Sequence, residues 1–277
     1  MSHEFYLPSQ EEVNQKLLVR GQVLPKVNYP SQNMDTPPTI VTVVDRKGPL
    51  IAVKNLSTVV SDQELLQAVG AIQIQLDRDW QPAWSTTATL EIYSVDQVIP
   101  DTHWSIFIMD SSDVEQALGY HGETYQSRPY ARVFAKDAAS YGQKWTVTFS
   151  HEVLEMMGNP WINLNVFHEG QSRLYAYESC DAVENDRYGY EIQGVMVSDF
   201  QYPAWFDETP RVGARFDHMG HCKTSFEILP GGYMPIFDVT GGSGWKVLRF
   251  HQESQDPQPN PRLRPLRHAL SAASTGA

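Results

Sequence analysis

The sequence predicts an α+β fold in which one helix carries the functional residues, and three observations lead to this prediction. Strand-like segments stand on both sides of helical segments, so we expect a mixed sheet. Residues 145–161 have helical periodicity and contain His151, Glu152 and Glu155 in the pattern H-E-x-x-E. The 277 residues, 41% of them hydrophobic, are enough to enclose a sizeable core.

The elements expected before this helix follow from residue type. Ser61 and Glu64 form a capping-box pattern, which predicts a helix from there to about Arg78. The expected strands are rich in β-branched and aromatic residues and are bounded by turn residues. They are residues 39–44, 51–53, 87–94, 104–109, 117–121 and 130–134.

Regular structure is harder to predict after the helix. We expect residues 174–183 to be helical and residues 188–198 to form a hairpin. Residues 226–229 and 244–250 have the composition of short strands.

Composition divides the chain into three parts. Residues 1–38 are polar and end in a turn-rich stretch, which indicates an N-terminal arm. Residues 39–250 contain the predicted elements and form one domain. Residues 251–277 are polar and proline-rich, so we expect a flexible C-terminal tail. Arm and tail are the segments through which a homo-oligomer or a particle would assemble.

Charge and cysteine content exclude several classes of protein. The net charge of −12 argues against a surface for nucleic acid or anionic membrane, since both need clustered basic residues. No apolar run approaches the ~20 residues of a membrane span, and the N-terminus lacks the features of a signal peptide. We therefore expect a location in the cytoplasm or in a particle assembled there. Cys180 and Cys222 are too few for a disulfide scaffold, and whether they pair stays open.

The helix at 145–161 has the spacing of a metal site. At about 100° per residue, His151, Glu152 and Glu155 fall on one face, opposite an apolar stripe. His and Glu four positions apart can bind one ion, and the acid at the second position then lies beside the metal-bound water. His151 and Glu155 are thus candidate ligands and Glu152 the candidate general base. The alternative is a surface helix whose polar face happens to contain these residues.

A third ligand is expected from the acidic segment at 178–184. If this segment is helical, Glu178 and Asp181 share a face. We expect Glu178 to be the third ligand and Asp181 to orient His151 through the distal ring nitrogen, although the two roles are interchangeable. The alternative is a solvated acidic helix face.

Two further residues are candidates for contact with a substrate. His121 ends the short strand predicted at 117–121, where a surface position is the simpler explanation. Tyr190 could donate to an oxyanion, and ordinary cross-strand packing is the alternative. The run His218-Met-Gly-His221-Cys222 is more typical of a structural loop than of a metal site.

The motif-bearing helix resembles the active-site helix of the zincin metallopeptidases, whose motif is H-E-x-x-H. His151, Glu152 and Gly158 match the metzincin version, whereas Glu155 and Trp161 stand where that version has its second and third histidines.

Other parts of the chain extend the resemblance. A third-ligand glutamate on a later helix is similar to the thermolysin-like zincins, which implies that role for Glu178. The strand order before the helix is similar to the zincin half-domain, and the resemblance implies that residues 117–121 are the edge strand that binds extended substrate. It also implies a single zincin-like domain over residues 39–250.

A second resemblance covers roughly residues 60–206. The chain resembles a group of uncharacterised bacterial and phage proteins that share S-H-E-[VL]-L-E-M, E-x-C-D-x-V-E and V-S-D-F-x-x-P segments. These are residues 150–156, 178–184 and 197–203 of this chain. This second resemblance implies a shared fold more than a known activity.

The glutamate at position 155 affects the choice of metal. One imidazole with two carboxylates neutralises a divalent ion, so the ion acidifies its water less than in a site with two imidazoles. Zinc is expected from the resemblance, and the harder oxygen ligands extend the choice to Mn, Fe or Ca.

We therefore expect a metal-dependent hydrolase of peptide bonds, with Glu152 activating water and a peptide or protein as substrate. The alternative is a non-catalytic structural or interaction module on the same fold, such as a phage or particle component. A third hypothesis is a metal-free hydrolase, such as a glycosidase. It would use two of the carboxylates Glu152, Glu155, Glu178 and Asp181 as acid and base.

Overall fold

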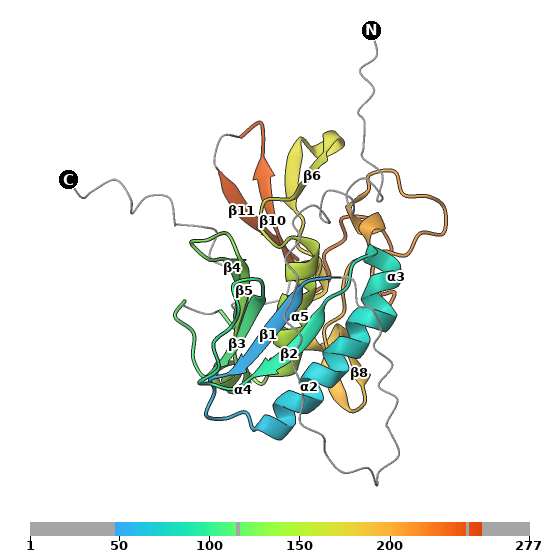
Figure 1. Ribbon diagram of the computed structural model, residues 1–277. Coiled ribbons are helices and arrows are strands. Elements are labelled where there is room, and N and C mark those ends of the chain that lie inside the picture. The colour runs from blue at the N-terminus through green and yellow to red at the C-terminus, as the bar shows by residue number, and fades with distance from the viewer. Residues whose placement is uncertain (1–47, 115–116, 242–243, 251–277) are drawn as a thin grey trace, which may run out of the picture. The chain divides into compact units, whose positions relative to one another are not determined.

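Three separate sheets organise the chain in the computed structural model, which describes residues 48–114, 117–241 and 244–250. The first is a five-stranded sheet, the second a four-stranded antiparallel sheet and the third a two-stranded hairpin (Figure 1). Helices are few and the first sheet is mixed, so the expectation of an α+β protein with a mixed sheet is confirmed.

The five-stranded sheet has the order β2-β1-β3-β5-β4. The first four strands run parallel to one another, and β4 at the edge is antiparallel to β5. The strands are β1 (Leu50–Asn55), β2 (Thr89–Tyr93), β3 (Trp104–Met109), β4 (Gly119–Glu123) and β5 (Pro129–Phe134). Each of the predicted strands within the described residues before the motif is therefore present, and the predicted strand at 39–44 lies outside them.

The first long helix begins as the capping box predicts. The Ser61 hydroxyl accepts from the Glu64 backbone N–H, and the Glu64 carboxylate accepts from the Ser61 backbone N–H. Helix α2 (Asp62–Ile74) does not end near Arg78 but continues through a π-helical segment, η1 (Gln75–Trp80), into α3 (Gln81–Trp84). Trp80 and Trp84 stack at 4.6 Å between ring centroids, which stabilises this last turn.

Helix α5 (Trp145–Gly158) contains the H-E-x-x-E pattern and is buried on all sides. Every residue from Val147 to Met157 is buried, the predicted polar face included. The helix packs against β4 and β5 and against the hairpin of β8 (Tyr190–Ile192) and β9 (Val195–Val197). The idea of a surface helix with a solvated polar face is therefore wrong, because later parts of the chain cover that face.

The second half of the chain differs most from expectation. Residues 174–183 are not helical, since β7 (Arg173–Ala176) leads into an irregular segment and the 3-10 turn Asp181–Val183. Residues 226–229 form a loop, whereas the hairpin at 188–198 and the strand at 244–250 are confirmed. The four-stranded sheet has the order β11-β10-β7-β6. Its remaining strands are β6 (Asn165–His168), β10 (Tyr233–Asp238) and β11 (Trp245–Arg249).

Two other expectations concern covalent links and the termini. Cys180 and Cys222 are both free and buried, so they do not pair. The predicted arm (1–38) and tail (251–277) lie outside the described residues. Within the described part, no helix combines the length and apolar composition that crossing a membrane requires.

Ser150 joins three elements in the core, which leads to a prediction about stability. Its hydroxyl donates to Gln75 Oε1 at 2.9 Å and accepts from the Ser198 backbone N–H at 2.8 Å, and all three groups are buried. Ser150→Ala leaves a buried donor and a buried acceptor unpaired, so we expect the free energy of unfolding to fall by about 2–3 kcal/mol.

Urea denaturation measures this loss. The control is Ser140→Ala, because the Ser140 hydroxyl is exposed and bonds only to the Asp137 carbonyl one turn earlier. The control should change stability by less than about 0.5 kcal/mol. Equal losses in the two variants would contradict the assigned role of Ser150.

Candidate metal centre

Helix α5 brings three of the predicted site residues to one place. His151, Glu152 and Glu155 project from the face that the helix turns towards the edge strand and the segment after β7. His151 Nε2 lies 3.3 Å from Glu155 Oε2, which is the contact expected of a His–Glu pair four residues apart.

The segment after β7 contributes the predicted acidic partners. Asp181 Oδ1 lies 3.3 Å from His151 Nε2, so Asp181 faces the same ring nitrogen as Glu155 and not the distal one. The Cys180 backbone N–H donates to Glu155 Oε1 at 3.2 Å. Glu178 lies three residues before Asp181, and its Oε1 accepts from Asn159 Nδ2 at 3.5 Å. Both acids are buried. The alternative prediction, a solvated acidic helix face, is therefore wrong.

Edge strand β4 adds His121, which is buried among these acids and is not a surface residue. Its Nδ1 lies 3.5 Å from Glu152 Oε2 and 3.5 Å from Glu155 Oε2. Its Nε2 lies 3.7 Å from Glu178 Oε2. Sequence analysis proposed His121 as a substrate contact, whereas the structure places it among the candidate ligands.

Gly119 explains how β4 approaches α5 so closely. Gly119 and His121 lie two positions apart on the strand and therefore point to the same face of the sheet. A Cβ at position 119 would lie 2.5 Å from Thr148 Cγ2 and 2.8 Å from Glu152 Oε1. The glycine thus leaves room for the Glu152 carboxylate beside His121.

Two groups of side chains have ligand atoms close enough to bind a metal ion. One consists of His151, Glu155 and Asp181, and the other of His121, Glu152 and Glu155. Within each group the ligand atoms lie within 4.8 Å of one another, and all of these residues are buried. Glu155 belongs to both groups.

Comparison of the chain with protein-family models, curated proteins and solved structures found no match. The functional assignment therefore depends on the geometry and charge of this cluster.

The cluster concentrates negative charge away from water. Burial, followed by the charges of Asp181 and Glu178, raises the pKa of Glu155 to about 8, although His151 acts in the opposite direction. Burial alone would lower the pKa of His151, but Glu155 and Asp181 outweigh it and raise that pKa well above its ordinary value. A cation at this place would relieve the repulsion between the carboxylates.

Tyr233 is a residue of the cluster that sequence analysis missed. It begins β10 of the second sheet and is buried, and burial raises the pKa of its phenol well above the ordinary value. The charges of Asp181, Glu184, Glu155 and Glu152 add to this effect, and β10 contacts the 3-10 turn Asp181–Val183. No local pattern marks a single tyrosine after Gly232 as part of a site, so only the contact between distant segments reveals it.

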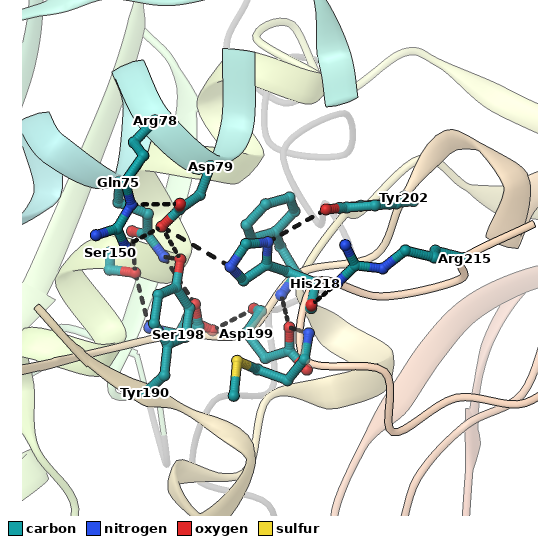
Figure 2. A network of polar contacts seen from close by, with 12 residues as sticks. Gln75, Arg78, Asp79, Ser150, Tyr190, Ser198, Asp199, Tyr202, Arg215 and His218 are labelled. Carbon is teal, nitrogen blue, oxygen red and sulfur yellow. Dashed lines mark hydrogen bonds and ion pairs between the residues drawn. The ribbon is translucent and has the colours of Figure 1, made fainter. Parts of the chain in front are cut away.

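Tyr190, the other predicted substrate contact, and His218 lie in a second polar network (Figure 2). Tyr190 donates to Asp79 Oδ2 at 2.8 Å and accepts from Gln75 Nε2 at 3.1 Å. His218 stacks on Phe200 and lies 3.8 Å from Asp79 Oδ2. Tyr190 and the residues of the His218 loop belong to neither metal-binding group of the described residues.

Two further carboxyl groups, Asp199 and Asp217, are buried near this network. Burial, followed by the neighbouring Asp217, raises the pKa of Asp199 well above its ordinary value of 3.8. Asp217 accepts from the backbone N–H groups of His221 and Cys222.

This arrangement predicts a pH-dependent effect of Asp199→Asn. Because the folded protein holds the Asp199 proton to a higher pH than the unfolded chain, the contribution of this group to stability is full at low pH. It is lost as the pH rises from about 4 towards the folded-state pKa. Asparagine is neutral throughout and can still donate to Asp217. We therefore expect the stability of the variant relative to wild type to increase as the pH rises above about 4.

Urea denaturation at several pH values tests this expectation. Asp96→Asn, which changes an exposed carboxylate, is the matched control and should show no such trend. A relative stability of Asp199→Asn that falls with rising pH would show that Asp199 is ionised in the folded protein.

Proposed function

We propose that this chain binds a divalent metal ion in the buried cluster and uses it to hydrolyse peptide bonds. The observation that carries the proposal is the convergence of two imidazoles and four carboxylates from three separate segments of the chain. His121, His151, Glu152, Glu155, Glu178 and Asp181 are each at most 4% exposed.

The balance of charge supports a cation. Carboxylates are seldom buried together without a compensating charge, because removing an ionised group from water costs several kcal/mol. Among these six residues, only the two histidines can become positive. Imidazole nitrogen with carboxylate oxygen is a ligand set that suits zinc, and the excess of oxygen also suits Mn, Fe or Ca.

His151, Glu155 and Asp181 would hold the ion. When bound, a divalent ion lowers the pKa of water and polarises a carbonyl group. Glu152 follows His151 on the same helix and is the carboxylate that would accept the proton of the attacking water. His121, 3.5 Å from Glu152, would orient that carboxylate and share the proton. Asp181 therefore takes the ligand position that the sequence suggested for Glu178.

A second candidate function is a non-catalytic module that keeps the metal for structural reasons, for example in a phage or other particle. The burial of the cluster favours it, because a peptide reaches these residues only if the covering segments move. In that case the ion stabilises the fold by holding β4, α5 and the segment after β7 together.

Glu152→Gln separates these two functions. The variant removes the base, so peptide cleavage should fall by about 10²–10⁴-fold. The ion held by His151, Glu155 and Asp181 should remain, as elemental analysis of the purified protein would show. Cleavage is measured on a mixed peptide library, and Glu191→Gln, which changes an exposed glutamate of β8, is the control.

Three outcomes bear on the proposal. Metal in the wild-type protein with cleavage that depends on Glu152 supports the hydrolase. Metal without cleavage, together with a chelator-induced loss of thermal stability, supports the structural module. Both functions would be excluded if the protein contains no metal after exposure to Zn²⁺ or Mn²⁺ and its thermal stability does not change when a chelator is added.

A further inference from the structure

The two metal-binding groups do not merge into one. His151 Nε2 belongs with Glu155 and Asp181, and His121 Nδ1 belongs with Glu152 and Glu155. Among the described residues, no group of ligand atoms within 4.8 Å contains both histidines. Ligand atoms of a single zinc ion lie about 2.0–2.2 Å from the metal and hence no more than about 4.4 Å apart. One ion therefore cannot bind both histidines in this arrangement.

Glu155 connects the two groups through a single atom. Its Oε2 lies 3.3 Å from His151 Nε2 and 3.5 Å from His121 Nδ1. Its other oxygen accepts from the Cys180 backbone N–H, which fixes the orientation of the carboxylate. An oxygen placed between two sets of ligands can bridge two metal ions, which lie about 3.5–4 Å apart in two-metal sites.

From this geometry we infer that the cluster is a dinuclear metal centre bridged by Glu155. This inference rests on the proposed metal binding and adds a second ion. His151 and Asp181 hold one ion, and His121 and Glu152 hold the other.

The charge balance of the cluster also favours two ions. Two divalent ions neutralise the four buried carboxylates, whereas one ion leaves two negative charges uncompensated in the interior. Glu178 Oε2, 3.7 Å from His121 Nε2, is then the carboxylate that orients this histidine on its second nitrogen.

An unsatisfied buried atom within the cluster points to a ligand. Asp181 Oδ1 is buried and has no hydrogen-bond partner in the described structure, although it faces His151 Nε2 at 3.3 Å. Buried oxygens are nearly always satisfied, so an oxygen left in this way is the expected state of a metal ligand.

Glu152 can serve both the second ion and the reaction. Its Oε2 faces His121, and its Oε1 lies towards the space beside Gly119. One oxygen of the carboxylate binds the ion while the other accepts the proton. The Glu152→Gln variant should consequently lose one of the two ions, and the ion beside His151 should remain.

The test is the metal stoichiometry of the full-length protein. The protein is saturated with Mn²⁺ or Zn²⁺, desalted and analysed for metal per chain. We expect two ions per chain and, for Mn²⁺, the electron paramagnetic resonance spectrum of an exchange-coupled pair. His121→Asn and His151→Asn should each retain one ion and lose the coupling. His168→Asn, which changes a histidine paired with Glu208 outside the cluster, should retain both.

The outcomes distinguish this inference from the proposed function. One ion per wild-type chain, with an uncoupled spectrum, overturns the dinuclear centre and leaves the proposed site with a single ion. No ion in the wild type overturns both. Because the wild-type measurement alone separates these cases, a variant that fails to fold, as judged by circular dichroism, does not weaken the test.

Discussion

The constraint on which the structure depends is the burial of several carboxylates around His151. In the protein interior, like charges repel strongly and each ionised group has lost its hydration. The fold nonetheless brings acids from α5 and from the segment after β7 against the histidine of β4. An arrangement with such a cost persists when something compensates it, and a bound cation does so for all of these acids at once.

The scaffold around the cluster keeps these groups in position. Ser150, next to His151, bonds to Gln75 of η1 and to Ser198, directly after β9, so the helix cannot rotate without breaking buried hydrogen bonds. Gly119 lets the edge strand approach the helix, and the Cys180 backbone N–H orients Glu155. These contacts hold the carboxylates and imidazoles of the cluster in position, and such preorganisation is what the proposed metal site would need.

The second polar network has a different character. Asp79, Tyr190 and Gln75 are linked by hydrogen bonds to one another, and burial beside Asp217 raises the pKa of Asp199. The network therefore joins the long helix, the hairpin and the His218 loop without an external partner. The two networks meet at Gln75 and Ser150, so the acidic cluster is built against a region held by buried hydrogen bonds.

The sequence by itself determined the local features of this protein. The capping box, the strands of the mixed sheet, the hairpin and the spacing of His151, Glu152 and Glu155 all depend on neighbouring residues, and the structure contains them. Only the tertiary structure decided which distant groups join the helix. His121 enters the cluster because β4 pairs with β5, and Tyr233 because β10 pairs with β7. Asp181 reaches His151 from a 3-10 turn where a helix was expected. Such contacts depend on long-range strand pairing, which the periodicity of a single segment does not predict.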